Sequence, residues 1–127
     1  MYTYAYDSAY QPALPVVDVE VMPFGHNSAP FNLVALVDSG ADGTLIPLVV
    51  LHAMHARRTG QVALVSITGL RTFVDIYEVT IRLGPHLFPK VRVAADRHNE
   101  TVTLGRDVLN HMIVTLNGLA ATTEILE

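Results

Sequence analysis

The chain has 127 residues, of which half are hydrophobic and only 16% are charged, so we expect one domain with a substantial apolar core. This apolar share is high for a small chain and would be explained by apolar surface hidden in an oligomer. The net charge of −4 gives no indication of a nucleic-acid or anionic-membrane partner, and the absence of cysteine excludes disulfides and thiolate chemistry.

The sequence contains no pattern typical of a secretion signal or a membrane-spanning helix. Its start, MYTYAYDSAY, lacks a basic region and an apolar core. The most apolar stretch, Leu45–Ala56, is too short to span a bilayer and contains two histidines. We therefore expect a cytoplasmic protein without a membrane partner.

Most of the chain is predicted to be β structure, because apolar residues alternate with polar ones or run continuously. The expected strands are Tyr2–Tyr6, Val17–Met22, Phe31–Val37, Gln61–Ile67, Phe73–Leu83, Leu87–Ala94, Thr101–Leu104, Ile113–Leu116 and Leu119–Leu126. The strands outnumber the helices, so we expect an all-β domain.

Several local signals give more specific expectations. Phe31–Val37 is nearly all apolar, which predicts a strand buried on both faces. Pro47–His55 is the best helix candidate, with Arg57-Arg58 at its solvated basic end. A second short helix is expected to begin at Gly105-Arg106-Asp107, and Asn117-Gly118 predicts a tight hairpin turn.

The segment most informative about chemistry runs from Ala35 to Ile46. A carboxylate, Asp38, stands at the mouth of an apolar strand and is followed by the hydroxyl of Ser39 and by Gly40. Apolar neighbours raise the cost of ionising a carboxyl group. A glycine lets another backbone come close, as a bound peptide would require. By itself, Asp-Ser-Gly is also typical of an ordinary turn.

Two separated motifs resemble the retropepsins, the family of retroviral proteases and their cellular and bacterial relatives. Asp38-Ser39-Gly40-Ala41 matches the active-site loop of that family, Asp-Thr/Ser-Gly-Ala. Val102 to Leu109 matches its second motif, an apolar strand ending in Gly-Arg-Asp/Asn before a short helix. The resemblance covers roughly residues 16–109. It implies that residues 1–127 form a single-lobe acid-protease β barrel with one or two short helices.

The resemblance also implies an activity, aspartic-type hydrolysis of peptide bonds without a cofactor or metal. This reaction uses two carboxylates that share one proton, and each chain supplies only one such loop. A homodimer would bring together Asp38 from both subunits, and Ser39 and Gly40 would complete each catalytic loop. The resemblance further implies an ion pair between Asp42 and Arg106.

The resemblance also implies roles for other parts of the chain, assigned by their position relative to the motifs. Residues about 65–78 correspond to the flap, a hairpin that closes over bound peptide, and residues about 113–127 to a C-terminal dimerisation segment that the tyrosine-rich start could join. The expected substrate-binding residues are Leu36, Gly40, Asp42, Leu45, Ile67, Gly69, Thr101 and Thr103. The expected structural supports are Asp42, Arg106 and Asp107.

Three alternatives remain open at this point. The fold could serve as a dimerisation or peptide-binding module with little or no turnover, or as a purely structural β domain whose Asp-Ser-Gly is only a turn. His52 and His55, three residues apart on the expected helix, could begin a zinc site, but the His-Glu-x-x-His spacing of metalloproteases is absent.

Overall fold

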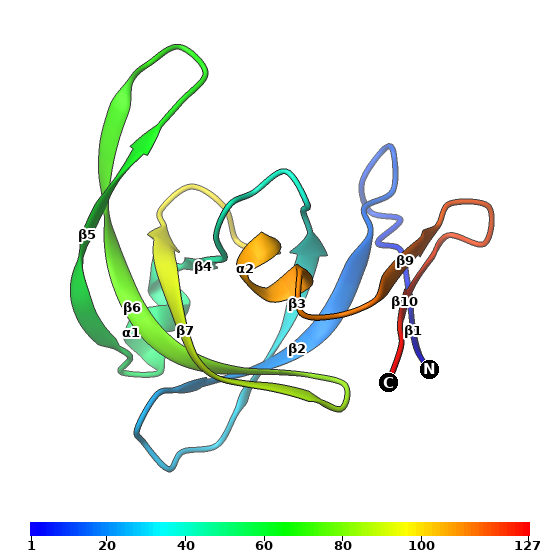
Figure 1. Cartoon of the computed structure of the whole chain (residues 1–127), viewed down its shortest axis with the longest axis horizontal. Helices are drawn as coiled ribbons and strands as arrows, with labels where there is room; N and C mark the ends of the chain where they lie inside the picture. Colours follow the sequence, from blue (N-terminus) through cyan, green and yellow to red (C-terminus); the bar gives the residue numbers. More distant parts are fainter.

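The computed structural model describes all residues from 1 to 127 and is built mainly of β-strands (Figure 1). The strands are β1 (Tyr2–Ala5), β2 (Val16–Pro23), β3 (Phe31–Val37), β4 (Leu45–Pro47), β5 (Arg57–Val65), β6 (Arg71–Leu83), β7 (His86–Asp96), β8 (Val102–Leu104), β9 (Val114–Asn117) and β10 (Thr122–Ile125). The two short helices are α1 (Leu48–Ala53) and α2 (Arg106–Leu109). Neither helix has the length and hydropathy needed to span a bilayer.

Six of the seven strands in the larger sheet form a closed barrel, and β5 extends the sheet beyond β6. The order of the seven strands is β2-β3-β8-β4-β7-β6-β5, and an additional β2–β6 pairing closes the sheet on itself. Most neighbours are antiparallel, but β3 pairs in parallel with β8, and β4 pairs in parallel with β7. These parallel pairs place the end of β3 next to the end of β8. The two motifs of the sequence, which follow these two strands, therefore meet at one place.

The barrel core is formed by one face of each strand. In β2, Val17, Val19 and Val21 are almost completely buried, whereas Asp18 is exposed, as the alternation of the sequence predicts. The prediction for β3 was wrong, because Val34 keeps 45% of its surface exposed.

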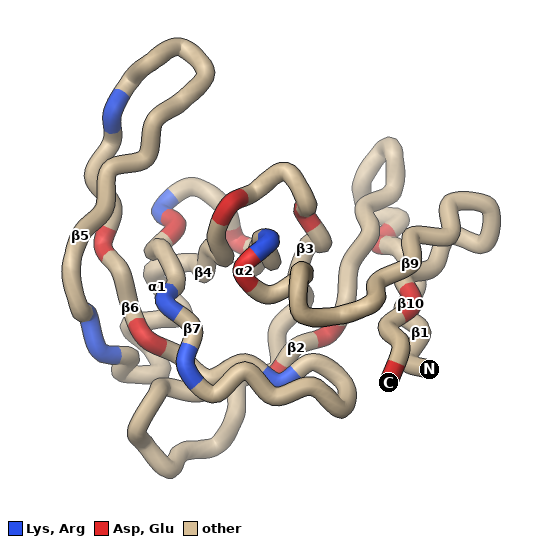
Figure 2. The backbone as a smooth tube through the Cα atoms, in the orientation of Figure 1, with Lys and Arg blue, Asp and Glu red and all other residues tan.

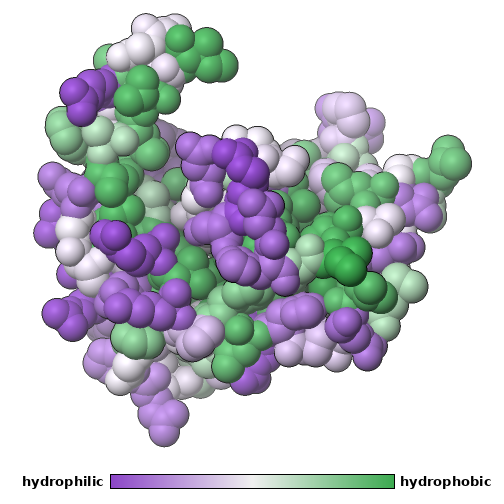
Figure 3. Space-filling model, viewed as in Figure 1, coloured by the Kyte–Doolittle hydropathy of each residue, from purple (hydrophilic) through white to green (hydrophobic).

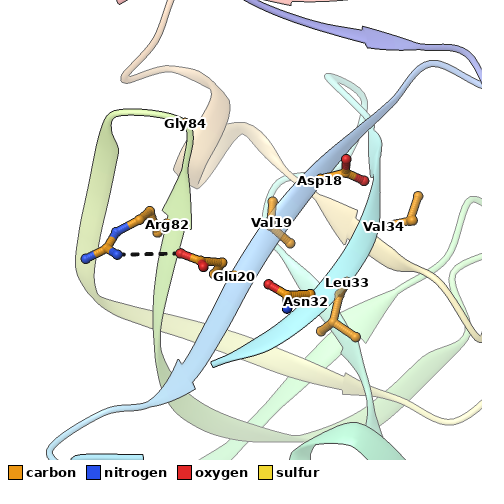
Figure 4. A pocket seen from close by; sticks show the side chains of 8 residues that line it. All are labelled: Asp18, Val19, Glu20, Asn32, Leu33, Val34, Arg82 and Gly84. Atoms are coloured by element: carbon orange, nitrogen blue, oxygen red, sulfur yellow. Dashed lines mark ion pairs between the residues drawn. The ribbon is translucent and has the colours of Figure 1, made fainter. Parts of the chain in front are cut away.

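The reason lies in the one-sided packing of this part of the sheet. Val34 pairs with Asp18 and Asn32 with Glu20, on the face turned away from the core. These residues line a shallow hollow that Arg82 borders, with its guanidinium 3.5 Å from the Glu20 carboxylate (Figure 4). A continuous apolar run can therefore form a strand with one buried face and one exposed face.

The helix prediction was right in position but too long. Helix α1 ends at Ala53, and His55 takes a left-handed conformation with φ of 56° that reverses the chain. Arg57 and Arg58 therefore begin β5 rather than ending the helix. His52 lies near Tyr77, with 3.4 Å between the imidazole Nε2 and the phenol oxygen, while His55 lies outside the helix. The two histidines therefore do not share a helical face.

The two ends of the chain form a second sheet, of order β1-β10-β9, at one side of the barrel (Figure 1). The predicted tight turn at Asn117-Gly118 is longer than expected. Asn117 pairs with Thr122, which leaves four residues between the strands. The Asn117 side chain accepts a hydrogen bond from the backbone N–H of Ala120 at 3.1 Å, so the asparagine stabilises a wider turn instead of entering a two-residue one.

Candidate active site

The Asp38 loop, which we define as residues 38–43, follows β3 directly. Asp38 is half-buried, and its backbone N–H donates to the carbonyl of Leu104 in β8 at 3.1 Å. Its carboxylate Oδ1 accepts a hydrogen bond from the N–H of Gly40 at 2.9 Å. A Cβ at Gly40 would lie 3.1 Å from the same oxygen, so glycine at this place leaves the carboxylate room. Strand pairing and a local hydrogen bond together orient Asp38.

Helix α2 braces this loop through Arg106. The backbone N–H of Arg106 donates to the carbonyl of Ala41 at 2.9 Å, and its guanidinium Nη1 donates to the carbonyl of Ser39 at 2.7 Å. The guanidinium Nη2 forms an ion pair with Asp42. Figure 2 shows the start of α2, with a basic and an acidic position, beside the acidic loop that follows β3. One arginine thus fixes three residues of the loop.

The Asp42–Arg106 pair lies at the surface of the single chain. The Asp42 side chain is 94% exposed and that of Arg106 is 42% exposed. A buried pair would lose about 3–5 kcal/mol on removal of one partner, but solvent screening reduces an exposed pair to about 0–1 kcal/mol. In the single chain, the hydrogen bond from Arg106 to the Ser39 carbonyl therefore contributes more to stability than the ion pair with Asp42.

We expect Arg106→Ala to lower the free energy of unfolding by about 1–2 kcal/mol, mostly through the lost charge-assisted bond to the Ser39 carbonyl. Urea denaturation followed by circular dichroism measures this change. Arg82→Ala is a matched control, since Arg82 is similarly exposed and pairs only with Glu20. It should cost less than about 0.5 kcal/mol. Equal losses in the two variants would contradict a bracing role for Arg106.

A second set of contacts, largely missed from the sequence, lies behind the loop. Thr44 is 1% exposed, and its N–H and hydroxyl donate to the Asp107 carboxylate at 3.1 and 2.8 Å. The same hydroxyl accepts a hydrogen bond from the N–H of Gly105 at 3.2 Å. Asp107 was expected to be a support, but Thr44 was not singled out. The only sequence feature that could have indicated Thr44 is its place as a single hydroxyl residue between Gly43 and an apolar run.

A groove runs from the Asp38 loop beneath the β5–β6 hairpin, and we call it the central groove. It has a volume of ≈ 450 Å³. Its floor is Gly40, Ala41, Asp42, Gly43, Thr44 and Leu45, and its walls are Val62, Leu64, Ile76, Arg92 and Ala94. A neighbouring hollow of ≈ 370 Å³ shares Leu45 and Leu64 and extends to Leu70 and Phe73 on the hairpin. The hairpin itself rises from the barrel past this loop (Figure 1).

The structure gathers only part of the expected substrate-binding set. Gly40, Asp42 and Leu45 line the central groove, but the other five residues line neither hollow of the single chain. Thr103 is buried at 9% exposure and pairs with Leu36 and Leu45 within the sheet. The side chain of Ile67 is fully exposed at the hairpin tip, where Gly69 has a φ of +83°. Thr101 is partly buried beside β8.

Two carboxylates with lowered pKa values stabilise the surroundings of the groove. Hydrogen bonds from Arg58 and Gln61 lower the pKa of Asp75, which joins the base of the hairpin to Arg97 at 3.8 Å. Burial of Asp96 opposes its ionisation, but hydrogen bonds from His98 and Asn99 outweigh this effect and lower its pKa. The stabilisation from each is complete above the usual pKa of about 3.9 and is lost as the pH falls through the lowered value. Both contacts therefore persist at mildly acidic pH.

Among solved structures, the chain is similar to retroviral proteases. The EIAV protease complexed with the inhibitor HBY-793 matches with a TM-score of 0.60 and 22% identity, over 77% of this chain and 86% of that one. The Simian Foamy Virus (mac) protease matches with a TM-score of 0.55 and 20% identity, over 75% and 91%. No protein-family model and no curated protein matches the sequence. The chain therefore has the retropepsin-like fold, a β barrel with two short helices.

Proposed function

We propose that the chain is an aspartic endopeptidase that works as a homodimer. The observation that carries the proposal is the Asp38 loop, in which Gly40 orients the Asp38 carboxylate and, with the following residues of the loop, lines a groove beneath a hairpin. The ion pair between Asp42 and Arg106 supports the proposal, because the family resemblance implies such a pair. The retropepsin-like fold of the chain also supports this activity.

In the proposed mechanism, Asp38 of each subunit contributes one carboxyl group to a pair that holds a single proton. The ionised member accepts a proton from water, which attacks the peptide carbonyl, while the protonated member donates to the carbonyl oxygen. Two carboxyl groups about 3 Å apart cannot both ionise, so the pair titrates as a unit. Ser39 would contact the partner loop across the two-fold axis. We expect an acidic to mildly acidic optimum, because the pair must keep its proton.

The β5–β6 hairpin is the proposed flap. The expected flap, about residues 65–78, runs from the tip of the hairpin along β6 to its base, and carries exposed apolar side chains, including Val65, Ile67, Leu70 and Phe73. Figure 3 shows hydrophobic surface at the projecting ends of this hairpin and of the β9–β10 hairpin. An apolar surface of this kind is stabilised when it closes over a peptide and excludes water.

The C-terminal segment, residues 113–127, is the proposed dimerisation surface. Strand β9 is the outer strand of its sheet, and no charged residue occurs from Ile113 to Thr123. Edge strands that remain free are usually protected by charges. Leu116 and Leu119 are 51% and 104% exposed, which fits a surface that a second copy covers.

We expect the double substitution Leu116→Glu and Leu119→Glu to weaken dimerisation by at least about tenfold, because the partner surface would have to desolvate two charges. Sedimentation velocity over a concentration series measures this. Truncation is a poorer test, because Ile125 in β10 is fully buried and its removal would damage the core. Val49→Glu is the control, since Val49 is 74% exposed on α1. A double variant that dimerises like the wild type would contradict the assignment.

Incubation of the wild type and of Asp38→Asn with a peptide library at about pH 4–7 tests the function itself. Peptide cleavage by the wild type that is lost in the variant supports the endopeptidase. Binding without cleavage in both proteins would contradict it and favour the peptide-binding module. The exposed apolar hairpin is the observation that favours this second candidate, because such a surface can hold a peptide without turnover.

A further inference from the structure

Arg92 stands out as a charged residue of the central groove that has no partner in the structure. It lies in β7, is exposed, and lines the groove together with residues of the Asp38 loop. The other charged residue of the groove, Asp42, is already paired with Arg106. The guanidinium of Arg92 takes part in no ion pair and no hydrogen bond, although its backbone belongs to the β6–β7 ladder.

The carboxylates nearest to Arg92 along the sheet and helix are engaged elsewhere. Glu78 is its cross-strand partner in the register of β6 and β7, but the Glu78 carboxylate pairs with Lys90 at 3.1 Å. Asp107 lines a neighbouring hollow together with Arg92, but its oxygens accept hydrogen bonds from Thr44 and from the N–H of Val108. The N–H donors of the Arg92 guanidinium therefore have no acceptor, and the rest of this groove wall is largely apolar.

Such an arrangement fits a peptide that carries a carboxylate. Val62, Leu64 and Ile76 make the rest of the wall apolar, so the groove combines apolar contact for a peptide with one unpaired positive charge. Guanidinium groups bind carboxylates through paired, charge-assisted hydrogen bonds. Arg92 lines the groove together with Gly40, whereas Asp38 itself does not line it. A peptide residue that reaches Arg92 would therefore be removed from the cleaved bond.

We propose that Arg92 selects peptide substrates with an aspartate or glutamate side chain at a position removed from the cleaved bond. This inference rests on the proposed function and names its substrate class. In a symmetric dimer, Arg92 of each subunit serves one half of the peptide. The acidic preference is therefore expected at corresponding positions on both sides of the bond.

The test uses one parent peptide that carries Glu, Gln or Lys in turn at each position around the bond. Cleavage is measured as kcat/KM, and binding to Asp38→Asn is measured by fluorescence anisotropy. We expect Glu to be preferred over Gln by about tenfold at one pair of positions, the order expected of a charge-assisted hydrogen bond. The ratio should fall as salt is added.

Arg92→Ala should bring the Glu-to-Gln ratio close to one, and Arg92→Glu should shift the preference to Lys. Arg82→Ala, an exposed arginine outside the groove, should keep the wild-type ratio. An absent acidic preference, or one that survives in Arg92→Ala, overturns the inference even when cleavage is normal. Acidic peptides that bind through Arg92 but are never cut support the inference and overturn the proposed hydrolysis.

Discussion

Asp38→Asn should reduce peptide cleavage by at least about a thousandfold while leaving the fold intact, because the variant removes both the general base and the proton-sharing acid. Asparagine has the same shape, and its amide oxygen can still accept the hydrogen bond that Gly40 donates to Asp38. The variant should therefore unfold at the same urea concentration as the wild type. The loss of peptide cleavage would then come from the missing carboxyl group and not from unfolding.

The cleavage assay needs a control for the general loss of a carboxylate. Asp18→Asn provides it, because Asp18 is an exposed aspartate on the outer face of β2, away from the groove (Figure 4). Its kcat/KM should stay within about twofold of the wild type. Asp38→Asn with substantial remaining activity would show that another group performs the chemistry.

Mixing the two proteins tests whether one site needs two chains. When equal amounts of wild type and Asp38→Asn exchange subunits freely, about a quarter of the dimers are wild type in both halves, so the activity per wild-type chain falls to about half. A catalytic centre contained within one chain would instead keep its full activity. The activity of the mixture therefore distinguishes an active site formed by two subunits from one formed within a single chain, and the test does not require the dimer geometry.

The sequence predicts the barrel well where local patterns and tertiary packing agree. Val17, Val19 and Val21 alternate with polar residues and point into the core, and β2 forms as expected. The apolar run of β3 misleads, because hydrophobicity alone does not say whether a second layer covers the outer face of Val34. Only the arrangement of the strands in space decides this.

The candidate site likewise contains features that the sequence predicts and features that depend on the arrangement of the strands and helices in space. The Asp42–Arg106 contact follows from two separated motifs, but its exposure does not, because burial depends on which elements surround the loop. Thr44 was missed because its importance comes from a partner 63 residues away, Asp107. Five of the expected substrate-binding residues line neither hollow, and their roles would have to arise in the dimer or on closure of the hairpin.

Gly43 and Gly105 are in close contact and join the two motifs. A side chain at Gly105 should therefore have a large effect on stability. A Cβ built at Gly105 would lie 2.5 Å from the carbonyl carbon of Gly43 and 2.6 Å from its oxygen. The obstacle is backbone and not the end of a flexible side chain, so a side-chain rotation cannot relieve it. The backbone at Gly105 has φ −91° and ψ −177°, a conformation open to any residue. The glycine is therefore required by contact and not by torsion.

We expect Gly105→Ala to lower the free energy of unfolding by about 3 kcal/mol, at the upper end of the range for overpacking, because the loop and α2 must separate to admit one methyl group. Urea denaturation measures the loss. Gly60→Ala is the matched control, since a Cβ at this place meets nothing within 4 Å. It should change stability by no more than about 0.5 kcal/mol. The separation should also disturb the bonds from Arg106 to Ser39 and Asp42, so catalysis should fall in the fraction that remains folded. A Gly105→Ala protein with control-like stability would show that the loop and α2 are not held in contact, and the bracing of Asp38 would lose its structural basis.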